Sequence, residues 1–383
     1  MIWKLNKSLY GLKQAPLLWY RHIDAFLKNL GFMSTNSDSN IYISKTREMI
    51  ILLYVDDLLI ISPSLANIRS IKAHLSEKYQ MTDLGPAKQF LGIELKQIQH
   101  SGIQYWTICQ RRFISTILSR FGMLSCKGVA TPLDKGNLLR KADPEYCSTL
   151  TIQQEYQKLV GCLMYLMMGT CPDLAYTVST LSKFNMKPTA NHLLAAKRVL
   201  RYIQATAHLH LAFKMRTESY VEGFRDSDWA GDKDDSKSTS GYLFTLSGAA
   251  ICWKSRKQNL IALSSTEAEY IALTGAAKEA TWLRRLHQEI CSLLNMDNSS
   301  LQGSIPILVD NQAAIHMAKV PRFHDRTKHI SIRYHYVRSA IENNLITLDY
   351  IPTTDNPADI LTKALSRNLH ESHILRLGLS SFT

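Results

Sequence analysis

The sequence predicts a multidomain protein that combines the α+β and α/β fold classes. Three features predict this: an acidic turn between two apolar runs near residue 56, a strongly helical stretch over 153–206, and strands that alternate with helices from residue 220 onward. The chain has 383 residues, of which 45% are hydrophobic and 20% charged. This length and composition allow two or three domains, each with its own core.

The acidic turn is the segment Tyr54-Val55-Asp56-Asp57, which lies between two runs of apolar residues. Such a pattern predicts a β-hairpin with carboxylates at its tip. Adjacent ionised carboxylates repel each other, so the arrangement is favourable mainly when a divalent cation lies between them. Asp56 and Asp57 are therefore candidate ligands of a two-metal phosphoryl-transfer site. The alternative interpretation is a solvated Asp-Asp turn.

The rest of the first 219 residues predicts helices joined by short hairpins. A helix ends at Gly31, a second has apolar residues on one face, a hairpin turns at Ser101-Gly102, and another helix stops at Gly122. The segment from Thr131 to Pro144 is polar and predicts a linker. The helix over 191–205 carries a basic face of Lys197, Arg198 and Arg201, which is either plainly solvated or in contact with a phosphate backbone.

The C-terminal part predicts a mixed sheet flanked by helices. The expected elements are a strand over 221–225, a hairpin through Ser247-Gly248, a long helix over 267–288, a buried strand over 306–309, helices over 312–318 and 330–343, and a closing strand over 345–351.

Four carboxylates occupy the ends of these elements in the order Asp226, Glu269, Asp310 and Asp359. Each has an ordinary explanation as a helix cap or a turn residue. As a set, carboxylates at strand ends and helix starts can converge on one edge of a sheet and hold two metal ions. Glu267 and Asp228 are the alternatives to Glu269 and Asp226.

The overall charge favours a polyanionic partner. The formal net charge is +13, which is typical of nucleic-acid-binding proteins. The seven cysteines are scattered without C-x-x-C spacing, as expected of reduced thiols in an intracellular protein. No apolar run approaches the length of a membrane span, so we expect no membrane partner.

Several ordered motifs give the chain a resemblance to the Pol polyprotein of copia-type LTR retrotransposons over nearly its whole length. The motifs are Lys4–Pro16, Tyr54–Asp57, Phe90–Glu94, Asp228–Asp232, Ser238–Tyr242, Ser264–Tyr270, Lys328–Ile330 and Ala358–Lys363. Their number and order make the match more specific than any single short motif.

The resemblance implies a partial reverse transcriptase palm and thumb over 1–130, a linker and helical connection over 131–218, a ribonuclease H-like mixed-sheet domain over 219–368, and a tail over 369–383. It implies that Asp56 and Asp57 are metal ligands of the polymerase and that Gln14 lines the pocket of the incoming nucleotide. It assigns Asp226, Glu269, Asp310 and Asp359 to the metal ligands of the ribonuclease H. The segment after Glu269, Tyr270-Ile271-Ala272-Leu273, favours Glu269 over Glu267.

The same resemblance implies two Mg²⁺ or Mn²⁺ ions per active site, and an RNA–DNA hybrid or template–primer as the partner. Other Pol segments such as integrase are further expected partners, in a cytoplasmic virus-like particle or the nucleus. A first polymerase aspartate would lie upstream of Asp56, and Asp24 sits on a helical pattern that cannot replace it. We therefore expect the polymerase fingers and one metal ligand to be missing, and no polymerase activity from this chain alone.

The expected activity is hydrolysis of the RNA strand of RNA–DNA hybrids by the C-terminal domain. The alternative is a catalytically silent retrotransposon relic that only binds nucleic acid. An integrase-like nuclease, with three carboxylates, would leave Tyr54–Asp57 unexplained.

Overall fold

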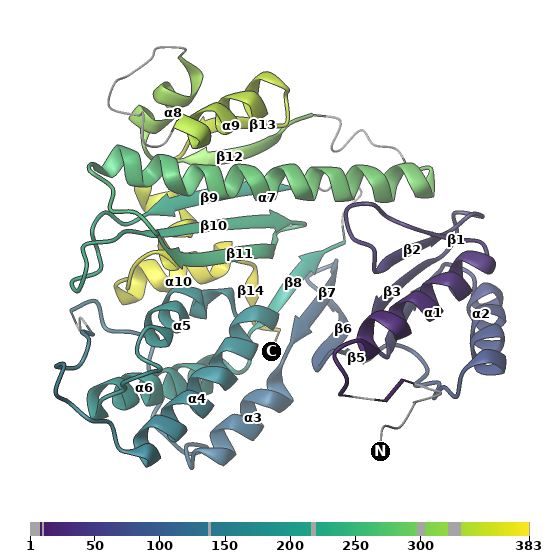
Figure 1. The fold of residues 1–383 in the computed structure, drawn as a ribbon, viewed down its shortest axis with the longest axis horizontal. Helices are drawn as coiled ribbons and strands as arrows, with labels where there is room; N and C mark the ends of the chain where they lie inside the picture. Colours follow the sequence, from purple (N-terminus) through teal and green to yellow (C-terminus); the bar gives the residue numbers. More distant parts are fainter. Residues whose placement is uncertain are drawn as a thin grey trace, which may run out of the picture. The chain divides into compact units, whose positions relative to one another are not determined.

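The computed structural model describes residues 8–9, 11–136, 139–215, 220–296, 303–320 and 331–382. The motif residues Lys4–Lys7, Tyr10 and Lys328–Ile330 lie outside these ranges. The chain divides into two compact units, drawn together in Figure 1: the first comprises residues 1–91 and 282–299, and the second residues 92–281 and 300–383. Within the described ranges, no helix combines the length and the apolar character that a membrane span requires.

The first unit is a four-stranded antiparallel sheet covered by helices. Its elements are α1 (Ala15–Asn29), β1 (Phe32–Ser34), β2 (Ile41–Ser44), β3 (Ile50–Tyr54), β4 (Asp57–Ile61), α2 (Leu65–Lys78), β5 (Gln89–Phe90) and the last part of α7 (Ser265–Leu294). Pro16 at the start of α1 and Gly31, with a φ of 87°, just after it explain the bounds of that helix. Ile23 and Leu27 of α1 pack with Ile51 of β3 in a buried core.

The second unit contains two sheets and most of the helices. Its elements are β6 (Ile93–His100), β7 (Ile103–Cys109), α3 (Arg111–Arg120), α4 (Leu150–Gly169), η1 (Pro172–Leu174), α5 (Ala175–Ser182), α6 (Ala190–Thr206), β8 (His210–Lys214), β9 (Glu222–Ser227), β10 (Thr239–Leu246), β11 (Ala249–Lys257), the first part of α7, β12 (Ile305–Val309), α8 (Gln312–Lys319), α9 (Ser331–Glu342), β13 (Ile346–Tyr350), η4 (Thr353–Asp355), η5 (Pro357–Leu361), α10 (Arg367–Arg376) and β14 (Leu379–Ser380).

The larger sheet has the strand order β11-β10-β9-β12-β13. β9, β10 and β11 are antiparallel, whereas β12 runs parallel to both β9 and β13. One face contacts η5 and α5, and on the other face Glu279 of α7 accepts a hydrogen bond of 2.8 Å from Tyr242 of β10. This arrangement confirms the predicted mixed sheet and the multidomain α+β and α/β class.

The second sheet joins segments that the sequence assigned to three different domains. Of its strands, β6 and β7 come from 1–130, β8 comes from 131–218, and β14 comes from 369–383. These strands pair in the order β14-β8-β7-β6. Residues 369–383 are therefore not a simple tail, because α10 buries His373 and β14 completes a sheet. The boundary between compact units falls after Leu91 rather than near residue 130.

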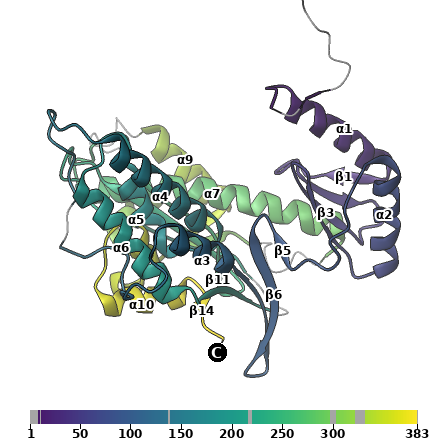
Figure 2. The same ribbon diagram turned by 90° about the horizontal axis from the view of Figure 1, so that it is seen from below.

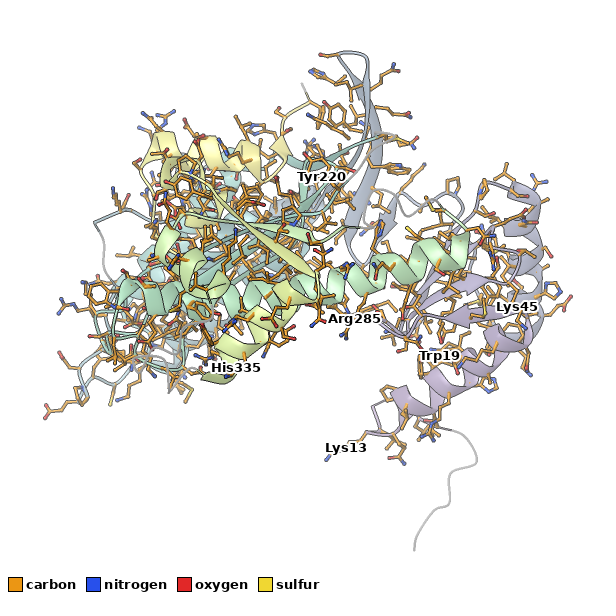
Figure 3. The ribbon with its side chains drawn as sticks, turned by 90° about the horizontal axis from the view of Figure 1, so that it is seen from above. Lys13, Trp19, Lys45, Tyr220, Arg285 and His335 are labelled. Carbon is orange, nitrogen blue, oxygen red and sulfur yellow. The ribbon has the colours of Figure 1, made fainter. Side chains whose placement is uncertain are left out.

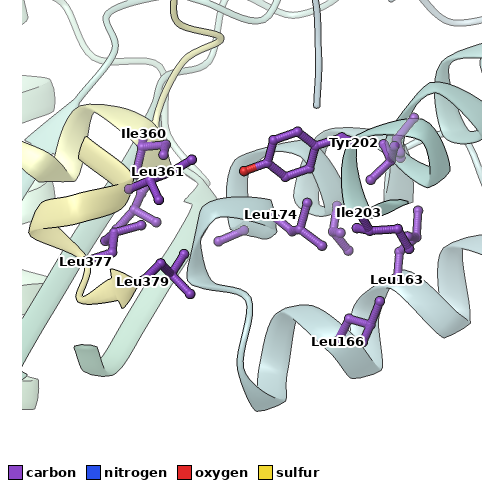
Figure 4. Close-up of a cluster of buried hydrophobic side chains, with 14 of the residues drawn as sticks. Leu163, Leu166, Leu174, Tyr202, Ile203, Ile360, Leu361, Leu377 and Leu379 are labelled. Atoms are coloured by element: carbon purple, nitrogen blue, oxygen red, sulfur yellow. The ribbon is translucent and has the colours of Figure 1, made fainter. Parts of the chain in front are cut away.

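The helical connection and the mixed sheet share one hydrophobic core. Figure 2 shows α3, α4, α5 and α6 gathered in one group, and these helices contact one another. Figure 4 shows Leu163 and Leu166 of α4, Leu174 of η1, and Ile360 and Leu377 of the C-terminal segment, which belong to one cluster of buried side chains. The segments that the sequence assigned to 131–218 and 219–368 therefore fold as one unit.

The basic face of α6 is engaged within the chain. Lys197 pairs with Glu155 at 2.8 Å and Arg198 with Asp134 at 2.6 Å, while Arg201 donates to the carbonyl oxygen of residue 127 at 2.8 Å. These contacts tie α6 to α4, to Asp134 of the linker and to the backbone at residue 127. Neither of the two alternatives that the sequence left open, plain solvation or phosphate contact, anticipated this role.

Candidate metal centre

Three of the four carboxylates predicted from the sequence meet at one edge of the larger sheet. Ligand oxygens of Asp226, Asp310 and Asp359 all lie within 4.8 Å of one another. Asp226 is in β9 and Asp310 directly follows β12. The parallel register pairs Leu308 with Phe224, and two residues further along each strand come Asp310 and Asp226. The carboxyl ends of adjacent parallel strands thus place these two side chains together.

Asp359 reaches the site from η5, which is fixed to the sheet by its cap. The Asn356 side chain accepts a hydrogen bond of 3.1 Å from the backbone N–H of Ala358 and donates one of 2.9 Å to the carbonyl oxygen of Arg225. Both bonds are buried. Because one amide side chain satisfies the start of η5 and binds β9, Asp359 is held beside Asp226.

A glycine in β10 allows η5 to approach the sheet this closely. Gly241 lies opposite Asp226 in the antiparallel register. A Cβ atom at Gly241 would lie 2.8 Å from Cβ of Leu361 and 2.8 Å from Cγ2 of Thr362. The glycine in the Ser238–Tyr242 motif is thus required by close packing, not by backbone conformation.

Thr362 and Lys363, which the sequence analysis named only as part of the Ala358–Lys363 motif, contact the aspartates. The Thr362 hydroxyl donates to Oδ2 of Asp226. The Lys363 ammonium lies 2.9 Å from Oδ1 of Asp359 and 3.6 Å from Oδ2 of Asp226. Lys363 is four residues after Asp359, and this spacing could have predicted their contact, because residues four apart on a helical backbone lie side by side.

Burial and the nearby charge of Asp226 raise the pKa values of Asp359 and Asp310. Burial, then the charge of Asp226, raises the pKa of Asp359 to about 7, while Lys363 acts in the opposite direction. The same two causes raise the pKa of Asp310, opposed by Arg225. Burial would lower the pKa of Lys363, but the carboxylates of Asp226 and Asp359 outweigh it and raise that pKa. The site therefore binds positive charge.

The donor set fits a hard divalent cation. Asp310 Oδ1 is buried and has no hydrogen-bond partner among the described residues. A buried carboxylate oxygen without a partner is costly, and Mg²⁺ or Mn²⁺ binds preferentially to such oxygens. In the part of the chain that the structure describes, this is the one group of three or more potential ligands.

Glu269 is not part of the group formed by the three aspartates and pairs with a different residue. It lies in the first turns of α7 and forms an ion pair with Arg225, which precedes Asp226 in β9. Sequence reasoning missed Arg225, although a charged residue at a buried strand position was a visible signal. Glu267, the alternative, accepts a hydrogen bond of 2.8 Å from the backbone N–H of Leu263 at the start of the helix.

Asp228 and Trp229 lie just beyond β9. Asp228 accepts a hydrogen bond from the backbone N–H of Thr239, which gives it a structural role in the β9–β10 connection. Burial raises its pKa to about 6. Trp229 is 56% exposed, and its indole N–H donates a hydrogen bond of 3.1 Å to the carbonyl oxygen of Ala262.

Asp56 and Asp57 lie at the tip of the predicted hairpin in the first unit. β3 and β4 pair from Ile50 with Ile61 to Tyr54 with Asp57, and both carboxylates are exposed. Trp19 of α1, labelled in Figure 3, donates to the carbonyl oxygen of Val55 at 2.7 Å and fixes the turn. Gln14 is exposed at the start of α1.

Comparison with known proteins gives matches over most of the chain. The reverse transcriptase (RNA-dependent DNA polymerase) family matches residues 1–135. A retrovirus-related Pol polyprotein from transposon TNT 1-94 of Nicotiana tabacum is 41% identical over 381 residues, which are 97% of this chain and 28% of that protein. The corresponding protein from transposon RE1 of Arabidopsis thaliana is 37% identical, over 98% of this chain and 25% of that protein.

A shorter relative is covered almost completely. A transposon Ty5-1 protein of Saccharomyces cerevisiae is 34% identical over 281 residues, which are 73% of this chain and 89% of that protein. The chain spans only about a quarter of the length of the two plant polyproteins. A foamy viral protease-reverse transcriptase solved with dsDNA gives a TM-score of 0.44 at 15% identity, over 90% of this chain and 60% of that chain.

Proposed function

This chain belongs to the Pol polyprotein family of copia-type LTR retrotransposons, and from that premise we propose that its C-terminal part hydrolyses the RNA strand of RNA–DNA hybrids. The observation that carries the proposal is the convergence of Asp226, Asp310 and Asp359 from three separate elements within 4.8 Å. Carboxylates gathered in this way, one of them with an unpartnered buried oxygen, suit metal-dependent phosphodiester hydrolysis.

Asp226, Asp310 and Asp359 would hold the ions, with Glu269 as the fourth carboxylate of the set. Bound Mg²⁺ or Mn²⁺ supplies a nucleophilic water at neutral pH and stabilises charge on the leaving oxygen. The chain's own groups orient the ligands: the Thr362 hydroxyl fixes Asp226 and the Asn356 amide fixes η5. Lys363 keeps a positive charge beside the carboxylates, where a phosphate of the substrate can contact it.

The substrate would be recognised by shape. A hybrid duplex exposes the 2′-hydroxyl groups of its RNA strand in a wide minor groove, which distinguishes RNA from DNA. The net charge of +13 favours contact with the phosphate backbone. Template–primer and other Pol segments such as integrase are further partners in this proposal. The Asp56-Asp57 hairpin and Gln14 would belong to the polymerase module.

A cleavage assay tests the proposal directly. The wild-type chain, Asp310→Asn and the control Asp349→Asn are incubated with an end-labelled RNA–DNA hybrid and Mg²⁺ or Mn²⁺. We expect Asp310→Asn to lose more than about 100-fold in rate, beyond the usual effect of losing an outer contact of a metal site. Asp349 is exposed on β13, so its loss should leave the rate unchanged.

A wild-type chain that binds the hybrid but cleaves it with neither metal would contradict the proposal. That result would support the alternative of a silent relic that only binds nucleic acid.

A further inference from the structure

We propose that Arg225 is a positioning residue that withholds Glu269 from the three aspartates, so that this site binds one divalent ion before Glu269 can contribute to a second. The inference rests on the proposed metal-dependent function of the same site. It concerns the order and number of the ions, which the proposed function leaves open.

Arg225 is buried next to the site. Its side chain is 0% exposed and is the largest by volume of the fully buried side chains among the described residues. It is adjacent to Asp226 in β9, and successive side chains of a strand point to opposite faces. Arg225 therefore contacts Glu269 of α7 on one face, while Asp226 meets Asp359 on the other.

The buried guanidinium of Arg225 forms an ion pair with Glu269, and the carboxylates of Asp310 and Asp226 also stabilise its charge. Nε and Nη2 of Arg225 have no hydrogen-bond partner among the described residues, and neither does Oε2 of Glu269 apart from the ion pair. Removing either partner would leave an uncompensated buried charge, which is strongly unfavourable. If Glu269 turns toward a metal ion, it must therefore give up its ion pair with the guanidinium.

The second cation of the site differs from Arg225 in being displaceable. Lys363 is 40% exposed at its side chain and lies at the end of η5, so its ammonium can move into solvent when a metal ion arrives. Arg225 has no exposed surface through which to leave.

Binding of Mn²⁺ to the whole chain without nucleic acid tests the inference. Free Mn²⁺ is measured by its electron paramagnetic resonance signal during titration of wild type, Asp310→Asn, Glu269→Gln, Arg225→Met and the double variant Arg225→Met/Glu269→Gln. We expect one tightly bound ion in wild type. Glu269→Gln should change its affinity by less than about threefold, whereas Asp310→Asn should weaken it by at least about tenfold, as loss of a true ligand does.

Arg225→Met should release Glu269 and either add a second bound ion or tighten binding by at least about tenfold. The double variant should return to one ion, because it has neither the guanidinium nor the freed carboxylate. Arg225→Lys, which keeps the charge, should behave like wild type. A merely structural role of Arg225 would affect thermal unfolding of these variants in EDTA but not the number of ions bound.

Two results would overturn the inference. One is a loss in Glu269→Gln as large as that in Asp310→Asn, which makes Glu269 a ligand of the first ion. The other is an unchanged number and affinity of ions in Arg225→Met. If Arg225→Met does not fold, the comparison of Glu269→Gln with Asp310→Asn decides alone. If Asp310→Asn itself binds Mn²⁺ like wild type, the proposed metal centre fails, and not only the role of Arg225.

Discussion

Asp173, Tyr202 and His370 form a buried hydrogen-bonded chain between η1, α6 and α10. The Tyr202 hydroxyl donates to Oδ2 of Asp173 at 2.6 Å and lies 3.0 Å from Nε2 of His370. Burial raises the pKa of Asp173 to about 6, with the Tyr202 hydroxyl acting in the opposite direction, and burial lowers the pKa of His370 to about 4. Both groups are therefore held neutral over part of the acidic range.

Replacing Asp173 should change how stability depends on pH. Folded Asp173 keeps a proton between about pH 4 and pH 6 that the unfolded chain has released, so its contribution to stability falls as pH rises through this window. The free energy of unfolding of Asp173→Asn minus that of wild type should therefore increase by up to about 3 kcal/mol from pH 4 to pH 6.5. Urea unfolding at a series of pH values measures this difference.

Asp349→Asn, in which an exposed carboxyl on β13 is lost, controls for the removal of a charge alone. A difference for Asp173→Asn that stays flat or falls between pH 4 and pH 6.5 would show that Asp173 is ionised in the folded protein throughout.

At the scale of elements, the contact between β10 and η5 positions Asp359. Gly241→Ala should destabilise the protein by about 1–3 kcal/mol, because the new methyl group meets Leu361, Thr362 and the carbonyl oxygen of Ala358. It should also weaken Mn²⁺ binding, since η5 must move to make room. Thermal unfolding and the Mn²⁺ titration measure the two effects.

Gly161→Ala is the matched control for that substitution. Gly161 lies in α4 with nothing within 4 Å of an added Cβ, so alanine there should stabilise by about 0.5–1 kcal/mol through helix propensity. If Gly241→Ala is as well tolerated as Gly161→Ala, the close packing of η5 on β10 is not what holds Asp359.

The β3–β4 hairpin presents carboxylates that lack a third partner. Asp56 and Asp57 belong to no group of three potential ligands among the described residues. We expect the chain of 383 residues to show no metal-dependent primer extension on an RNA template, like the variant Asp56→Asn/Asp57→Asn, because phosphoryl transfer depends on positioning and charge stabilisation. The double variant should still cleave a hybrid. Extension by wild type but not by the double variant would show that a further carboxylate completes the site.

At the scale of the whole molecule, the helical connection and the mixed sheet depend on each other for burial. Leu163, Leu166 and Leu174 pack in one cluster with Ile360 and Leu377. Each such side chain contributes about 1.5–3 kcal/mol when buried. We therefore expect residues 220–383 alone to show no cooperative thermal transition, whereas residues 92–383 should unfold cooperatively by circular dichroism. A cooperative transition in the shorter fragment would restore the boundary that the sequence placed at residue 219.

The sequence by itself determined the elements and the identity of the aspartates. Apolar periodicity, the turn residues Ser101-Gly102 and Ser247-Gly248, and the carboxylates at strand ends are all local signals, and they predicted many of the helices and strands, although not β1, β2, β8, α10 or β14. The position of Asp226 and Asp310 at the ends of two buried strands was sufficient to predict that they meet, because parallel strands align their carboxyl ends.

Only the tertiary structure decided what surrounds those aspartates and where the units divide. The pairing of Arg225 with Glu269, the approach of Lys363 to Asp226, and the union of β7, β8 and β14 in one sheet all join residues that are far apart in the chain. Charge pairing and shared burial depend on distances in space, and no periodicity along the chain records them. A basic residue in a strand therefore looked unremarkable until folding placed it against a carboxylate of the site.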